Sequence, residues 1–119
     1  KGQIEGGFVQ GAGWLTIEEV NWKSNGELTT HSPSTYKIPA VNDMPEKFNV
    51  KIYKNLNKEN VVNKSKTTGE PPLMLAMSVF FAIKDAISSV GSYAKIPKLN
   101  APATPEAILL SIKDLTNKL

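Results

Sequence analysis

The sequence contains no cysteine, no arginine and only one histidine. Without cysteine the chain can form no disulfide, no thiolate zinc site and no iron–sulfur cluster of its own. The single histidine, His31, stands beside a Ser-Pro turn and cannot assemble a metal cluster of several protein ligands or support a Ser/His/Asp arrangement. These absences argue against a metal held by the side chains of this chain, and the lack of cysteine permits a reducing compartment.

The lack of arginine bears on the partners of this basic chain. All 14 cationic side chains are lysines, and the net charge is +3. Bidentate recognition of a phosphate or a guanine edge is arginine chemistry, and these lysines are scattered rather than gathered with aromatic residues between them. The composition therefore favours a solvated lysine surface, and we expect no nucleic-acid partner.

The chain is also short of long apolar runs. Its 119 residues, 40% of them hydrophobic, suit one domain. The longest apolar run, Leu73 to Ile83 interrupted only by Ser78, is too short to span a bilayer, and no charged segment with a cleavage site opens the chain. We therefore expect a cytoplasmic domain with no membrane partner.

Four glycines stand among the apolar residues of the first segment, residues 3–17. Each interior glycine costs a helix roughly 0.5 to 1 kcal/mol relative to alanine. A helix is therefore doubtful here unless another backbone or a ligand approaches closely. Gly7 and Gly11, four residues apart, would form a smooth groove on one face of such a helix. The GAGWLT run lacks the third glycine and the preceding strand of a dinucleotide-binding fingerprint.

The middle of the chain predicts short strands. Residues 17–31 read as two strands joined at Asn25-Gly26, a dipeptide that accepts the positive φ angles of a tight hairpin turn. Residues 48–56 alternate apolar and polar side chains, as a half-buried strand does, and residues 61–62 suggest one further short strand. With the helices predicted below, these strands indicate an α+β fold.

Two helices are predicted in the second half. Apolar residues between 72 and 90 recur at steps of three and four and cover nearly every side, which is typical of a helix buried in something large. Thr104 as N-cap, Pro105 at the first helical position and Glu106 in the first turn predict an amphipathic helix to Leu115. The other elements offer too little apolar surface to wrap the 72–90 helix, so the chain is predicted to be a fragment or subdomain.

Glu70 is the first candidate for chemistry because it stands at the entrance to the apolar helix, ahead of Pro71 and Pro72. The prolines stiffen this entrance and direct the carboxylate. A helix N-terminus favours the ionised form by roughly 0.3 to 1 kcal/mol, whereas burial can raise a carboxyl pKa by about 3 to 5 units. In a site closed to water, Glu70 would be a usable base near neutral pH. The alternative is a favourable charge on the helix dipole.

Other polar residues are weaker candidates. Gln3 and Gln10 flank the glycines, and their amides can present donors and acceptors to a heterocycle or a pterin. Surface amides are an equally good interpretation. The remaining acids of interest are expected to be solvated charges: Glu5, Glu18, Glu19, Glu46 and Glu106.

Four stretches, in order, resemble the carboxy-terminal part of the molybdenum-binding subunit in the xanthine dehydrogenase family of molybdenum hydroxylases. They are GQIEGGFVQGAGWLTIEEV, HSPSTYKIPAVNDMPEKFNV, SKTTGEPPLMLAMSVFFAIKDAI and PATPEAI. The resemblance covers nearly the whole chain, and the GEPPL form is similar to the xanthine branch rather than to aldehyde oxidases. It implies that residues 1–119 are a C-terminal fragment of a molybdenum/molybdopterin-binding domain.

What the resemblance implies is the oxidative hydroxylation of a purine, hypoxanthine or xanthine toward urate, at a molybdenum–molybdopterin centre. Glu70 would be the general base, and Gln3 and Gly69 would contact the molybdopterin. Electrons would leave through 2Fe–2S clusters to FAD in other domains or subunits. Substrate-clamping residues would come from upstream of Lys1, so this chain alone would be inactive. A related aldehyde or N-heterocycle hydroxylase and a catalytically silent assembly module remain as alternatives.

Overall fold

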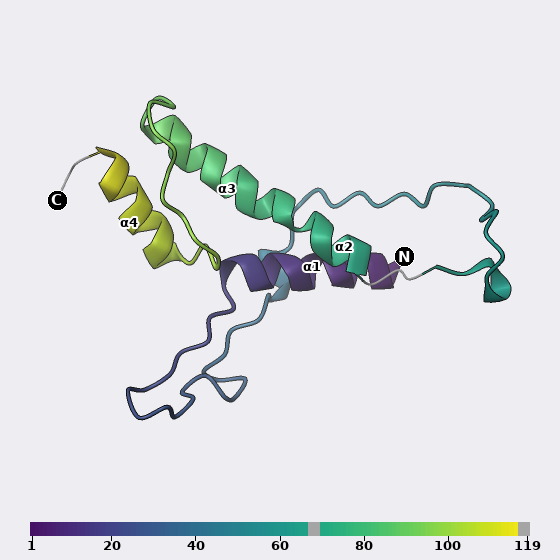
Figure 1. Cartoon of the computed structure of the whole chain (residues 1–119), viewed down its shortest axis with the longest axis horizontal. Helices are drawn as coiled ribbons and strands as arrows, with labels where there is room; N and C mark the ends of the chain where they lie inside the picture. Colours follow the sequence, from purple (N-terminus) through teal and green to yellow (C-terminus); the bar gives the residue numbers. More distant parts are fainter. Residues whose placement is uncertain (67–69, 117–119) are drawn as a thin grey trace.

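The computed structural model describes residues 1–66 and 70–116, which are mainly helical (Figure 1). In Figure 1, α2 lies across the central α1, α3 continues from α2 and diverges from α1, and α4 stands beside α3. Two long connections, residues 17–40 and 44–61, project away from these helices. The elements are α1 (Gly2–Thr16), η1 (Val41–Asp43), η2 (Val62–Lys64), α2 (Glu70–Leu75), α3 (Met77–Val90) and α4 (Pro105–Thr116).

The first helix forms in spite of its glycines, so the doubt about a helix over residues 3–17 was wrong. Gly11 and Gly13 are the buried residues of α1. A Cβ atom added to Gly11 would lie 2.8 Å from the Cβ of Ala76 and would collide with the carbonyl oxygen of Leu73. The bare backbone therefore lets α2 rest directly on α1. This tertiary contact compensates for the low helix propensity of glycine.

The helix predicted over residues 72–90 is divided into α2 and α3. The division falls at Ala76, which is 0% exposed at the contact with α1. There the backbone hydrogen bonds join residues three positions apart, as in a 3₁₀-helix. The Ala76 N–H donates to the Leu73 carbonyl at 3.1 Å, and the Val79 N–H donates to the Ala76 carbonyl at 3.0 Å. The helical region also begins earlier than predicted, at Glu70. Proline is well tolerated in the first turn because that turn needs no intrahelical N–H.

The stretch from α2 to α3 is mostly exposed. It spans 21 residues, and by length and composition alone it is long and apolar enough to cross a membrane. The prediction of a run too short to span considered residues 73–83 alone, whereas the helical stretch continues through Lys84 and Asp85 to Val90. The part of the chain that the structure describes does not enclose the stretch, in agreement with the prediction that the other elements offer too little apolar surface. Its exposed large apolar side chains are Met74, Leu75, Met77, Phe81 and Val90.

The hairpin predicted for residues 17–31 is present as a turn rather than as two strands. Trp22 and Leu28 form an isolated antiparallel bridge, and Gly26 has a φ of 84°. Only glycine adopts this left-handed backbone without steric cost, as the Asn25-Gly26 dipeptide predicts. The turn was therefore predicted correctly, and the strand lengths were not.

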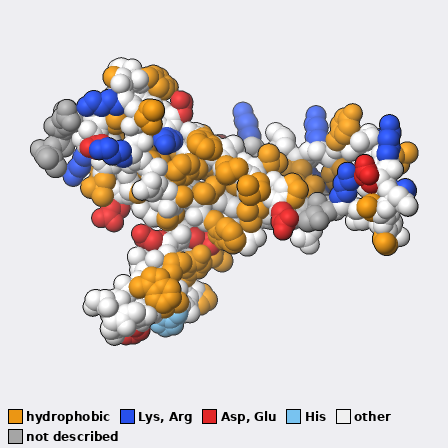
Figure 2. Space-filling model, viewed as in Figure 1, with side chains coloured by type: hydrophobic (Ala, Val, Ile, Leu, Met, Phe, Trp, Pro, Cys, Tyr) orange, Lys and Arg blue, Asp and Glu red, His pale blue; other side chains and the backbone are white. Residues whose placement is uncertain are grey.

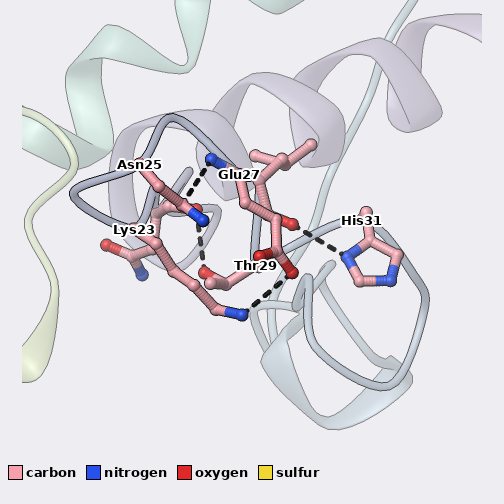
Figure 3. Close-up of polar contacts among 7 residues, drawn as sticks. Lys23, Asn25, Glu27, Thr29 and His31 are labelled. Atoms are coloured by element: carbon pink, nitrogen blue, oxygen red, sulfur yellow. Dashed lines mark hydrogen bonds and ion pairs between the residues drawn. The ribbon is translucent and has the colours of Figure 1, made fainter.

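Local polar contacts hold this turn together (Figure 3). Lys23 Nζ donates to Glu27 Oε1 at 2.9 Å, and the Glu27 N–H donates to Asn25 Oδ1 at 3.1 Å. The Thr29 hydroxyl donates to the Asn21 carbonyl at 2.8 Å. All of these contacts are exposed and join residues close in sequence, so the turn needs little support from the rest of the chain.

The other predicted strands do not form, and the α+β fold class is not confirmed. Residues 48–56 belong to no strand, and the turn of 3₁₀-helix at residues 62–64 takes up part of the predicted 61–62 strand. A strand pattern becomes a strand only where a neighbour completes its hydrogen-bond ladder. The described residues supply no such neighbour to these segments.

The small apolar core lies between α3, α4 and the segment before α4. Ile87, Leu99 and Ala103 are its buried members. The Ala103 N–H donates to the Leu15 carbonyl at 2.7 Å and so ties this segment to the end of α1. The partly buried residues packed around the core are Phe80, Ile83, Ala107, Ile108, Ile112 and Leu115.

The last helix begins as predicted. The Ala107 N–H donates to the Thr104 hydroxyl at 3.2 Å, which is the N-cap interaction, and Pro105 is the first helical residue. The helix continues to Thr116, one residue beyond the predicted end.

Candidate functional site

Glu70 is the first residue of α2, and its side chain is exposed. Pro71 beside it is also exposed, whereas Pro72 is buried and anchors the start of the helix. The carboxylate thus stands at a rigid helix entrance, as the prolines predict. The described residues of this chain leave the carboxylate open to water.

Gln3 lies in the first turn of α1 and is exposed. Nothing lies within 4 Å of the positions that Cβ atoms would occupy on Gly2 and Gly6, so the backbone around this turn is open. A flat ring system could approach it closely and meet the amide of Gln3. The residues present therefore fit a pterin, as far as donor chemistry and free space are concerned. Gly69 lies outside the described residues.

The helices that carry these two side chains are in contact. The middle of α1, at Gly11, meets α2 at Leu73. In Figure 1 the amino-terminal ends of α1 and α2 point the same way. Gln3 and Glu70 therefore belong to the same end of one helix pair, although they stand 67 positions apart in the printed sequence.

A buried carboxylate near the end of α1 was not expected. Glu18 is 9% exposed, and the Tyr36 hydroxyl donates to its Oε2 at 2.5 Å. The hydrogen bond to Glu18 raises the pKa of Tyr36, with smaller contributions from burial and from the charge of Glu18. The prediction that Glu18 is a solvated charge was wrong. No local pattern could have revealed the pair, because the path of the 17–40 connection brings the two residues together.

A surface hollow lies in another part of the chain. It has a volume of about 390 Å³ and is lined by Thr30, His31, Ser32, Pro33, Tyr36 and Ile38. It belongs to the 17–40 connection, which projects away from α2, so it is not the place of the predicted base. His31 Nδ1 lies 3.0 Å from the Leu28 carbonyl in the hairpin (Figure 3). Within residues 1–66 and 70–116, no three His, Cys, Asp or Glu side chains gather where they could hold a metal ion.

Known proteins match this chain over nearly its whole length. Residues 1–45, which include α1 and Gln3, match the family model of a molybdopterin cofactor-binding domain. Over 99% of its length the chain is 44% identical to a xanthine dehydrogenase/oxidase of Felis catus, and over 90% it is 48% identical to one of Rattus norvegicus. It is 44% identical over 98% of its length to a xanthine dehydrogenase of Oryza sativa subsp. japonica. The chain spans only 8 to 9% of these relatives.

Proposed function

We propose, from the premise that this chain belongs to the xanthine dehydrogenase family, that it is part of a molybdenum/molybdopterin-binding domain and supplies the general base Glu70. The observation that carries the proposal is the direct packing of α1 on α2. The first of these helices lies in the segment that matches a molybdopterin cofactor-binding domain, and the second begins with Glu70. The reaction is the oxidative hydroxylation of a purine such as hypoxanthine or xanthine.

The role of Glu70 is to take a proton at a carboxylate oxygen when the substrate is hydroxylated. The molybdenum–molybdopterin group supplies the oxidation chemistry when it is bound. Proton transfer requires the carboxylate within about 2.6 to 3.2 Å of the proton donor, directly or through one water. Pro72 is buried at the helix start and limits the movement of the backbone that bears this carboxylate. Closure by the longer polypeptide would exclude water from the carboxylate of Glu70.

The role of Gln3 is to hydrogen-bond the pterin. Its exposed amide offers two donors and an acceptor, and the bare backbone at Gly2 and Gly6 leaves room for the ring system. Gly69, directly before Glu70 in the sequence, is proposed as a second contact.

The exposed apolar face of α2 and α3 is proposed to pack against the rest of a longer polypeptide rather than against a membrane. The relatives support this assignment, because this chain spans about a tenth of their length. The same polypeptide or assembly would carry the FAD and 2Fe–2S groups in its other domains and would work in the cytoplasm. A related aldehyde or N-heterocycle hydroxylase would use the same helix pair with a different substrate pocket.

The test is a Glu70→Gln substitution in the full-length, molybdenum-loaded enzyme. Glutamine keeps the size and polarity of the side chain but cannot act as the base, so we expect kcat for xanthine to fall by about 10²- to 10⁴-fold at unchanged molybdenum content. Glu106→Gln is the matched control, because Glu106 is also an exposed acid in the first turn of a helix. Near-normal xanthine turnover by Glu70→Gln would remove Glu70 from the mechanism.

Two further results would favour the alternatives. If the unsubstituted enzyme oxidises aldehydes and not purines, the proposed substrate class is wrong, although the assignment of Glu70 as the general base is unaffected. If neither the cofactor content nor the activity of the assembly depends on residues 1–119, the chain is a silent structural module.

A further inference from the structure

Glu18 is a carboxylate held out of water by a neutral partner. It is 9% exposed, and its hydrogen bond comes from the phenol of Tyr36. Removing a carboxylate from water is costly, and a charge-assisted O–H···O⁻ bond recovers part of that cost. Both residues lie outside the helix pair that bears Gln3 and Glu70, and the proposed reaction uses neither of them.

Glu18, the acceptor of this hydrogen bond, packs against Gly13 in the last turn of α1. The Glu18 N–H donates to the Gly13 carbonyl at 3.0 Å. A Cβ added to Gly13 would lie 2.5 Å from Glu18 Oε1 and 2.6 Å from the ring of Pro39. The carboxylate of Glu18 and the ring of Pro39 thus occupy the space that a side chain at position 13 would fill.

The opposite face of α1 carries the contact with α2. Gly11 and Gly13 are two residues apart, which on an α-helix is a rotation of about 200°. Gly11 meets Leu73 and Ala76, and Gly13 meets Glu18 and Pro39. The helix is therefore held between α2 on one face and the returning 17–40 connection on the other, and neither contact leaves space for a methyl group.

We propose that Glu18 and Tyr36 form a clasp that positions α1 and, through α1, the start of α2. The inference rests on the proposed function, because the side chain that it ultimately places is Glu70. Without the Tyr36 hydroxyl, Glu18 is a buried charge without its donor and turns toward water. The support at Gly13 is then lost, and α1 can shift away from α2. Glu18 and Tyr36 are positioning residues that do not touch the substrate.

The test uses the full-length enzyme with Tyr36→Phe, Glu18→Ala and Glu18→Gln. The first two remove the hydrogen bond, whereas the glutamine amide oxygen still accepts from the Tyr36 hydroxyl. Tyr53→Phe is the matched control, because Tyr53 is 86% exposed. Three properties are measured in the enzyme: kcat per bound molybdenum, KM for xanthine, and the molybdenum content. Amide hydrogen exchange of residues 2–16 and 70–76 is measured in the cofactor-free protein.

We expect Tyr36→Phe and Glu18→Ala to lower kcat per bound molybdenum by about 3- to 30-fold with KM little changed, since small misplacements of a catalytic group cost this much or more. Hydrogen exchange in both helices should become faster, and Glu18→Gln and Tyr53→Phe should behave like the unsubstituted enzyme. The proposal is overturned if Tyr36→Phe lowers molybdenum content alone, with kcat per bound molybdenum unchanged, because the pair then serves only folding.

The Glu70→Gln enzyme separates the two proposals. If Glu70→Gln is inactive and Tyr36→Phe turns over normally, the clasp is wrong and the proposed function stands. If Glu70→Gln remains active, the proposed function is wrong, and hydrogen exchange decides whether the clasp holds α1. Unchanged exchange in Tyr36→Phe then overturns the clasp as well.

Discussion

At Gly11 the missing side chain determines how closely two helices approach. A methyl group there would collide with the Leu73 carbonyl, which is backbone and cannot rotate away, and with the Cβ of Ala76. Gly6, in the same helix, has nothing within 4 Å of its Cβ position. One glycine of α1 is therefore tightly packed and the other has free space around it. The same substitution by alanine should destabilise the helix at Gly11 and stabilise it at Gly6.

We predict that Gly11→Ala destabilises α1 in the full-length protein and that Gly6→Ala stabilises it. Alanine improves helix propensity by roughly 0.5 to 1 kcal/mol at either position. At Gly11 the overpacking costs about 1 to 3 kcal/mol and outweighs this gain. Hydrogen exchange of the α1 amides in cofactor-free protein measures the difference. Slower exchange in both variants would mean that α2 does not rest on Gly11.

At the scale of one element, α4 combines a capping threonine, a proline in the first turn and a buried face. The Thr104 hydroxyl accepts from the Ala107 N–H, and Glu106 adds a negative charge near the helix N-terminus. These interactions lie within four residues of one another, so the helix start depends little on the rest of the chain. The partly buried apolar residues of α4, among them Ile108 and Ile112, then pack against the small core.

We predict that Thr104→Ala destabilises α4 by about 0.5 to 2 kcal/mol, because an N-terminal amide loses its acceptor. Thr104→Ser keeps the capping oxygen and should restore most of the stability. The exchange rates of the α4 amides in the full-length protein check both variants. Equal rates in Thr104→Ala and the unsubstituted protein would show that packing alone holds the helix.

At the scale of the whole molecule, the chain is less compact than a folded domain of the same length. Its radius of gyration is 18.2 Å, against about 13.5 Å expected for a compact domain of this size. Its accessible surface is 9514 Å², against roughly 6300 Å² for a folded monomer of its mass. Figure 2 shows apolar side chains over the region where α1, α2 and α3 cross. An excess of about 3000 Å² has the size of a permanent interface, which agrees with packing into a longer polypeptide.

We predict that the isolated chain of 119 residues binds a hydrophobic dye such as ANS and unfolds over a broad temperature range. Among the described residues, the buried hydrophobic side chains are Ala76 and the three core members Ile87, Leu99 and Ala103, which provide too little burial for a cooperative transition. The full-length protein at equal mass concentration is the control and should bind less dye. A sharp transition with no dye binding by the isolated chain would contradict the assignment of its apolar face as an interface.

The features that the sequence determined by itself are local. The α4 cap and the Asn25-Gly26 turn depend on side chains and backbone angles within a few residues, and both were predicted correctly. The periodic apolar residues from 72 to 90 indicated a helix for the same reason. The family resemblance selected Glu70 and Gln3, which local pattern alone would leave as an ordinary helix-start acid and a surface amide.

The tertiary structure decided what depends on distant segments. The glycine-rich segment is helical because α2 and the 17–40 connection pack against its bare positions. Glu18 is buried where Tyr36, 18 residues further along the chain, supplies its hydrogen-bond donor. Residues 48–56 carry a strand pattern but remain outside any strand, since no neighbouring strand completes their hydrogen bonds. Each of these outcomes depends on a contact whose two sides no short window of sequence contains.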